Sequence, residues 1–190
     1  MESTPPSLAR RLGWFGRWRF RRYSRDIIRR VQKYGWTSVG VTEDRNGGSM
    51  SYTIGFSDSV ASPEVVICGL NDESVNLILW DVFRHIKDGR MTLAENAPWP
   101  GVVKQGACVW RRVHPTNLAP EVFGSGFWYY ETRSARSRPL DMFQLVFPDR
   151  EGRLPWEEGC DREFLKSQFP YYEPDPDLPR KYELGAPQKS

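Results

Sequence analysis

Cysteines are few in this sequence, and none of them lie close together. The three of them, Cys68, Cys108 and Cys160, form neither a CxxC pair nor an even-numbered set. That arrangement argues against a disulfide framework and against a cysteine-based metal site. We therefore expect free thiols, no bound metal and a reducing, cytoplasmic setting.

Long apolar runs and the common catalytic motifs are also missing. No stretch approaches the roughly 18 apolar residues of a membrane-spanning helix, and the N-terminus lacks the uncharged apolar core of a secretory signal. No Walker loop, GxGxxG or GxSxG pattern occurs. The two histidines, His85 and His114, stand at no recognisable spacing from a nucleophile or a metal ligand. The sequence therefore indicates no particular reaction.

Aromatic residues, in contrast, are abundant. Eight tryptophans, eight tyrosines and ten phenylalanines in 190 residues supply large apolar surfaces, although the apolar fraction is only 39%. A chain of this length commonly forms one domain with a single core. We expect that core to be rich in aromatic side chains.

The order of apolar and turn-forming segments predicts an α+β fold. We expect a mainly antiparallel sheet of five or six strands, with a helix over Asn71–Lys87 packed on one face and an N-terminal helix over Leu8–Tyr34 nearby. Asn46-Gly47 is the strongest hairpin signal and should join the first two strands. The expected strands are Trp36–Thr42, Ser51–Phe56, Glu64–Leu70, Ala107–Val113 and Leu140–Phe147.

Three parts are expected along the chain. Residues 1–22 should form a basic aromatic arm, residues 23–170 a single α+β domain, and residues 171–190 a proline-rich extended tail. Within the domain, Met91–Gly106 is expected to be a loop, and whether it closes as a lid stays open. Pro120–Tyr130 should form a short helix despite its two glycines.

Positive charge is concentrated in the N-terminal part. Residues 1–35 hold ten arginines and lysines and two acidic residues, whereas the whole chain has a net charge of only +3. Because guanidinium groups pair with phosphates and flat aromatics stack or insert, the arm could bind nucleic acid, an anionic membrane surface or an acidic protein. Alternatively, its aromatics pack on the domain or on a second copy of the chain in a homo-oligomer. The predicted partner-binding residues are Arg17, Trp18, Arg19, Arg21 and Arg22.

A cluster of hydroxyls and carboxylates ends the predicted hairpin. Such a loop can present hydroxyl and backbone N–H groups to an anionic ligand. The alternative is that these serines and aspartates only cap the turn by bonding to their own backbone. The residues of the cluster are Tyr52, Thr53, Ser57, Asp58, Ser59, Ser62 and Glu64.

A second candidate lies in the segment PDREGRLPW, residues 148–156. Asp149 is expected to accept backbone N–H bonds in a tight turn, which is a structural role. In the functional interpretation, Asp149, Trp156 and Glu157 lie at the rim of a pocket, where the indole supplies a stacking wall. If there is one site, we expect it where the Phe56–Glu64 turn meets Asp149–Trp156.

Several segments together resemble an uncharacterised bacterial family, domain of unknown function 4262. They are GWTSVGV at 35–41, SYTIGF at 51–56, SPEVVICGL at 62–70, the helix that follows, and FQLVFPDREGRLPWEEG at 143–159. The resemblance covers roughly residues 30–170 and implies an α+β bacterial cytoplasmic protein, without implying a reaction. The family usually has His-Pro-Glu where this chain has Ser62-Pro63-Glu64, so any chemistry of that histidine is in doubt here.

Two classes of function remain open. The first is a binding or interaction protein with a small pocket on the body and a basic arm for an acidic partner. The alternative is a flavin- or nucleotide-dependent enzyme of the split-barrel type that uses the same pocket. In that case Thr53, Ser57 and Ser59 would face the phosphate of FMN. The first class ranks higher because the sequence offers no pairing of a nucleophile with a base.

Overall fold

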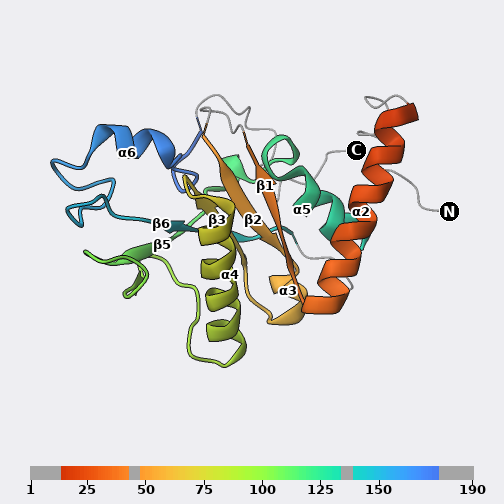
Figure 1. Ribbon diagram of the computed structural model, residues 1–190, viewed down its shortest axis with the longest axis horizontal. Coiled ribbons are helices and arrows are strands. Elements are labelled where there is room, and N and C mark those ends of the chain that lie inside the picture. The colour runs from red at the N-terminus through yellow and green to blue at the C-terminus, as the bar shows by residue number, and fades with distance from the viewer. Residues whose placement is uncertain (1–13, 43–47, 134–138, 176–190) are drawn as a thin grey trace, which may run out of the picture.

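A six-stranded sheet forms the centre of the molecule (Figure 1). The computed structural model describes residues 14–42, 48–133 and 139–175, with side chains described from Arg22 onward. The strand order across the sheet is β1-β2-β3-β6-β5-β4. The strands are β1 (Thr37–Val41), β2 (Met50–Ile54), β3 (Glu64–Cys68), β4 (Pro98–Trp99), β5 (Cys108–Arg112) and β6 (Met142–Val146).

All neighbouring strands run antiparallel except β3 and β6, which are parallel. The first hairpin pairs Thr37 with Ile54 and Val41 with Met50, so the expected antiparallel pairing is confirmed. Its predicted turn at Asn46-Gly47 lies outside the described residues. The predicted α+β class with a mainly antiparallel sheet is likewise confirmed, and the parallel pair sets Glu64 beside Met142.

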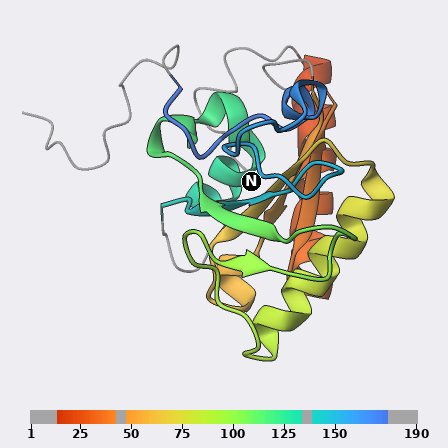
Figure 2. The same cartoon turned by 90° about the vertical axis from the view of Figure 1, so that its left-hand side faces the viewer.

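Helices cover both faces of the sheet, and the predicted helix after β3 packs on one of them (Figures 1 and 2). Helix α4 packs on one face and α5 on the other, while α2 runs along the β1 edge and joins the core on the α5 side. The helices are α2 (Trp14–Tyr34), α3 (Phe56–Ser59), α4 (Asp72–Lys87), α5 (Pro120–Thr132) and α6 (Arg162–Ser167), with a 3₁₀ turn at Pro115–Asn117.

Local sequence explains why α4 forms where it was predicted. Asn71 accepts a hydrogen bond from the backbone N–H of Ser74 at 2.9 Å, which caps the helix. Its buried apolar residues recur at helical spacing and face the sheet. They are Val75, Leu79, Val82 and Phe83.

Strand β3 separates two apolar cores. Val66 and Cys68 face the core that contains α2 and α5, whereas Val65 and Ile67 face the core under α4. Because successive strand residues point to opposite faces, a strand covered on both sides must be apolar throughout. Glu64, the first residue of this strand, is the exception, and it marks the candidate site.

Two glycines bring the end of α2 against the start of α3. Gly35 ends α2 with a φ of +87°, and its N–H donates to the carbonyl of Val31. Gly55 has a φ of +110°, and a Cβ there would lie 2.7 Å from the carbonyl oxygen of Gly35. Ser59 also donates from its hydroxyl to that carbonyl. The turn before α3 is thereby held in place.

The described C-terminal segment packs on the body beyond the predicted domain boundary at residue 170. Tyr171 is buried, and the side-chain amide of Asn117 donates to the carbonyls of Tyr171 and Glu173 at 2.8 and 2.7 Å. In the predicted loop 91–106, Trp99 pairs with β5 and its ring stacks on Trp110 at 5.6 Å. Among the described residues, no helix has both the length and the apolar character needed to cross a membrane.

Candidate functional site

A buried carboxylate stands at the centre of the candidate site. Glu64 is 1% exposed and accepts four hydrogen bonds. Oε2 accepts from the hydroxyl of Thr53 at 2.5 Å, while Oε1 accepts from the N–H groups of Gly55 and Ser57 at 3.2 and 3.0 Å and from the hydroxyl of Tyr130. A carboxyl group buried this completely is stable only with such partners.

The donors come from three elements that the fold brings together. Thr53 lies next to the last residue of β2, and its hydroxyl oxygen also accepts from the N–H of Val65 in β3 at 2.8 Å, so it links the two strands. Tyr130 lies near the end of α5, and its hydroxyl also accepts from the N–H of Gly55 at 2.9 Å. The site thus joins the sheet to the α5 layer.

Burial controls the protonation of this group. It raises the pKa of Glu64 above the ordinary value of a glutamate, against the opposite effect of its four donors. Burial also raises the pKa of Tyr130, and the neighbouring charge of Glu64 raises it further. Tyr130 therefore stays protonated and donates its hydrogen bond to Glu64.

A cavity of about 350 Å³ opens over this pair of side chains. Its walls come from the loop between α3 and β3 on one side and from the residues before β6 on the other. None of the described lysines or arginines lines it. We call it the Glu64 cavity, and its polar lining consists of Ser57, Ser62, Glu64, Tyr130 and Asp141.

The rim of the Glu64 cavity carries an ion pair. Asp141 accepts a hydrogen bond from the guanidinium of Arg112 at 2.5 Å, and both side chains are about half exposed. The same guanidinium lies 4.7 Å from the centre of the Phe143 ring. The charge of Asp141 is therefore balanced in part by Arg112, which is not itself a lining residue.

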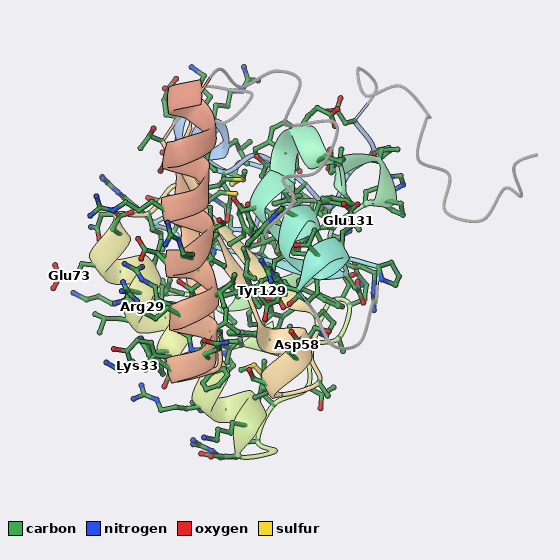
Figure 3. The ribbon with its side chains drawn as sticks, turned by 90° about the vertical axis from the view of Figure 1, so that its right-hand side faces the viewer. Arg29, Lys33, Asp58, Glu73, Tyr129 and Glu131 are labelled. Carbon is green, nitrogen blue, oxygen red and sulfur yellow. The ribbon has the colours of Figure 1, made fainter. Side chains whose placement is uncertain are left out.

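Asp58 makes a second link between α3 and α5. The hydroxyl of Tyr129 donates to its carboxylate at 3.0 Å, and Figure 3 shows the two residues on the neighbouring elements α5 and α3. Tyr129 and Tyr130, which are neighbours on α5, thus bind one acidic group within α3 and one at the start of β3. The turn that forms one cavity wall is fixed by side chains from a distant helix.

The structure brings together five of the seven predicted residues of the hairpin cluster and leaves two apart. Thr53, Ser57, Asp58 and Glu64 meet around α3, and Ser62 lines the Glu64 cavity beside them. Tyr52 instead faces the α5 core, where it packs on Phe123 at 5.2 Å and burial raises its pKa to about 12. Ser59 is bound to the end of α2.

The two predicted loops do not form one site. The Phe56–Glu64 turn lies where β3 begins, whereas Asp149–Trp156 follows the end of β6. Because β3 and β6 are parallel and pair Glu64 with Met142, these two loops occupy opposite ends of the sheet. The prediction that they meet was therefore wrong.

Asp149 organises its own loop. Its carboxylate accepts from the backbone N–H groups of Glu151, Arg153 and Asp161 and from the Arg153 guanidinium, all at 2.9 to 3.1 Å. Burial opposes the charge, but the N–H groups and the guanidinium outweigh it and lower the pKa of Asp149 to about 2. The geometry is that of the structural turn.

Trp156 lies in a stack on the surface. It is 45% exposed, and the guanidinium of Arg111 lies 4.8 Å from its ring centre and 4.6 Å from that of Tyr172. Glu95 pairs with the same guanidinium at 2.7 Å. The indole is thus occupied by protein contacts rather than facing the Glu64 cavity.

Sequence reasoning missed the tyrosines and the segment before β6. Tyr129, Tyr130, Leu140 and Asp141 were not among the predicted site residues, although all of them contact or line the site. One signal was available: a glutamate that opens an otherwise apolar strand needs donors, and the Trp-Tyr-Tyr of α5 supplies two hydroxyls.

Two remaining predictions concern metals and the basic arm. Within the described residues, no group of three histidines, cysteines or acidic side chains could hold a metal ion. Residues 14–22 form the first part of α2. The structure describes side chains only from Arg22 onward, and Arg22 is exposed. The other predicted partner-binding side chains, those of Arg17, Trp18, Arg19 and Arg21, therefore lie outside the described residues.

Comparison with known proteins gives one match. Residues 30–161 match a family described as domain of unknown function (DUF4262). No curated protein and no solved structure matches the chain. The matched range contains β1 to β6 and every residue of the Glu64 cavity.

Proposed function

Because the chain belongs to the DUF4262 family, whose description gives no activity, we propose a function from the site itself. The protein is a binding protein that holds a small polar molecule in the Glu64 cavity, and its basic arm contacts an acidic partner. We place it in a bacterial cytoplasm, in line with the family resemblance and with cysteines that are all free.

One contrast within the cavity carries the proposal. The side chains at the floor of the cavity are held by hydrogen bonds, because Tyr130 donates to Glu64 and both accept from the N–H of Gly55. The hydroxyls of Ser57 and Ser62 line the same cavity, yet neither makes a hydrogen bond with another described residue. A preformed small-molecule site combines polar groups fixed by the protein with hydroxyls that can still bind a ligand.

The lining indicates what kind of molecule would fit. Among the described residues it contains the acidic groups Glu64 and Asp141 together with hydroxyls, and no cationic side chain. Such a lining favours ligands that donate hydrogen bonds, such as amines and polyols, and disfavours anions. The volume of about 350 Å³ lies near the lower end of the usual range for ligand sites.

The flavin alternative gains no support from the hydroxyls that suggested it. Thr53 is buried between Glu64 and the N–H of Val65, and Ser59 is bound to the carbonyl of Gly35. The N–H of Ser57, which could have met a phosphate, donates to Glu64. These donors do not fit the phosphate of FMN, and we derive no redox step from them.

A thermal-shift panel tests the proposed binding. Small amines, polyols, inorganic phosphate and FMN are added separately to the full chain, and the melting temperature is recorded. Some amines or polyols should raise it by several degrees, and phosphate should leave it unchanged. Stabilisation by FMN, with flavin absorbance retained after gel filtration, would favour the enzyme alternative.

A further inference from the structure

A second hollow lies between the end of α2 and α4. Its volume is about 420 Å³, and three of its lining residues are aromatic. The rings of Trp36 and Trp80 are 5.0 Å apart, and Tyr34 meets Trp80 edge to face at 6.2 Å. We call this hollow the aromatic cleft. Besides these rings it is lined by Arg30, Ser38 and Asn76.

The aromatic cleft also offers polar groups. Trp36 is 3% exposed, and its indole N–H has no hydrogen-bond acceptor among the described residues. That nitrogen is fully buried, so a ligand in the cleft does not reach it. The exposed amide of Asn76 can both donate and accept.

A basic stripe runs along α2 to this cleft. Successive members are three or four residues apart, so they share the exposed face of the helix. Figure 3 shows Arg29 and Lys33 projecting from that face, and Arg29 is 75% exposed although it pairs with Asp26 at 2.9 Å. The stripe comprises Arg22, Arg25, Arg29 and Lys33, all of them exposed.

The basic stripe and the aromatic cleft adjoin each other at the end of α2. The ammonium of Lys33 lies 4.9 Å from the centre of the Tyr34 ring, and the exposed Arg30 lines the cleft itself. A molecule with a charged backbone along the stripe could therefore place a flat ring in the cleft. Proteins that bind single strands combine these same two features, a cationic track and aromatic stacking surfaces.

We propose that the aromatic cleft and the basic stripe bind single-stranded nucleic acid, with a base in the cleft and phosphates along the stripe. The inference deepens the partner half of the proposed function, and it rests on described residues of α2 and α4 rather than on the first part of the arm. The rings of Tyr34 and Trp80 would stack on the base, and the exposed amide of Asn76 would pair with its polar edge.

The shape of the surface favours nucleic acid over a membrane. Membrane-binding helices carry large apolar side chains that insert among lipids. Of the exposed large hydrophobic residues in the described part, α2 contributes only Tyr23 and Tyr34, and each has a polar hydroxyl. The aromatic rings line a hollow, which suits an unstacked base, and the one exposed apolar side chain that α4 contributes in the described part is Leu77, which is 66% exposed.

Fluorescence anisotropy with the full chain tests the proposal. The probes are a labelled oligouridylate of about 12 nucleotides, an abasic strand of equal length, and the same sequence in a duplex. The oligouridylate should bind about tenfold more tightly than the abasic strand, and its affinity should fall steeply between about 50 and 200 mM salt. Equal binding of all three probes would show charge attraction without a base site, and would overturn the proposal.

Matched variants separate the two features. Tyr34→Ala should remove most of the preference for the oligouridylate over the abasic strand. Arg29→Ala/Lys33→Ala should lower the affinity for all three probes and reduce its dependence on salt. Arg162→Ala/Lys166→Ala removes the same charge from exposed positions on α6 and should change nothing. If Tyr34→Ala loses stability, Asn76→Ala serves as a second cleft variant, with a smaller loss of base preference expected.

Two further outcomes would decide against the proposal. Binding to phosphatidylserine vesicles without binding to any oligonucleotide would identify a membrane surface, and unchanged base preference in both cleft variants would remove the cleft from the site. Ser57→Trp, which fills the Glu64 cavity, should leave oligonucleotide binding unchanged. Failure of the small-molecule site and failure of the nucleic-acid site are thus distinguished.

Discussion

The hydroxyl of Tyr130 donates a hydrogen bond to Oε1 of Glu64, although 66 residues separate the two in the chain. Tyr130 belongs to α5 and Glu64 begins β3, so this bond joins the helix layer to the centre of the sheet. The N–H of Gly55 donates to both side chains. The pair therefore fixes the floor of the Glu64 cavity and the turn that forms its wall.

Replacing Tyr130 by phenylalanine should destabilise the protein by about 1–3 kcal/mol, because Glu64 loses a buried donor and the N–H of Gly55 loses an acceptor. Urea unfolding of the variant measures the loss. Tyr129→Phe is the matched control: it removes a partly buried bond to Asp58 and should cost less. Equal stabilities of Tyr130→Phe and the wild type would show that the bond contributes little.

Glu64 should make stability depend on pH. Between the ordinary pKa of glutamate and the raised pKa of folded Glu64, the folded state binds more protons than the unfolded state. The free energy of unfolding should therefore decrease as pH rises through that range. Glu64→Gln keeps the size of the side chain and should flatten this dependence in urea titrations at successive pH values. A slope that is the same in both proteins would contradict the raised pKa.

Gly55 should tolerate no side chain. Gly55→Ala imposes a φ of +110° on an alanine and sets its Cβ 2.7 Å from the carbonyl of Gly35. We expect a loss of about 2–4 kcal/mol from strain and overpacking, measured by urea unfolding. Gly124→Ala on α5, where a Cβ meets nothing within 4 Å, should be neutral or gain up to about 1 kcal/mol. Similar results for both variants would contradict the close approach.

Asp149 should stabilise the protein only above acidic pH. Its lowered pKa of about 2 means that the stabilisation is complete above the ordinary pKa of aspartate and is lost as pH falls toward 2. Asp149→Asn should lower the melting temperature at neutral pH, and the gap to the wild type should close on acidification. Ligand binding in the Glu64 cavity should be unaffected, since Asp149 follows the far end of β6. A loss of binding in this variant would argue that the two ends of the sheet are coupled.

Local patterns in the sequence predicted much of the fold. The β-branched runs around Val39 and Val66 became strands, and the stripe from Val75 to Phe83 became the buried face of α4. Thr53, Ser57 and Glu64 were expected at one end of a hairpin, and hairpin geometry alone brings them together. Predictions of this kind depend on neighbours in the chain.

The rest depends on contacts between distant segments. Pairing of β6 with β3 in parallel placed Asp149 at the opposite end of the sheet from Glu64, and nothing local in either strand encodes that neighbour. The same pairing brought Asp141 to the cavity. Tyr130 reached Glu64 only because α5 packs over the start of β3. Tertiary contacts of this kind determine which segments become neighbours, and the local sequence pattern does not predict them.

Occupancy of the Glu64 cavity is the most direct test of the proposed function. Native mass spectrometry compares the wild type, Ser57→Trp and the control Thr92→Trp, an exposed loop position, after incubation with the amines and polyols that stabilise the protein. We expect a bound small molecule on the wild type and on Thr92→Trp, and none on Ser57→Trp. Equal occupancy of all three folded proteins, or no adduct on any of them, would contradict it.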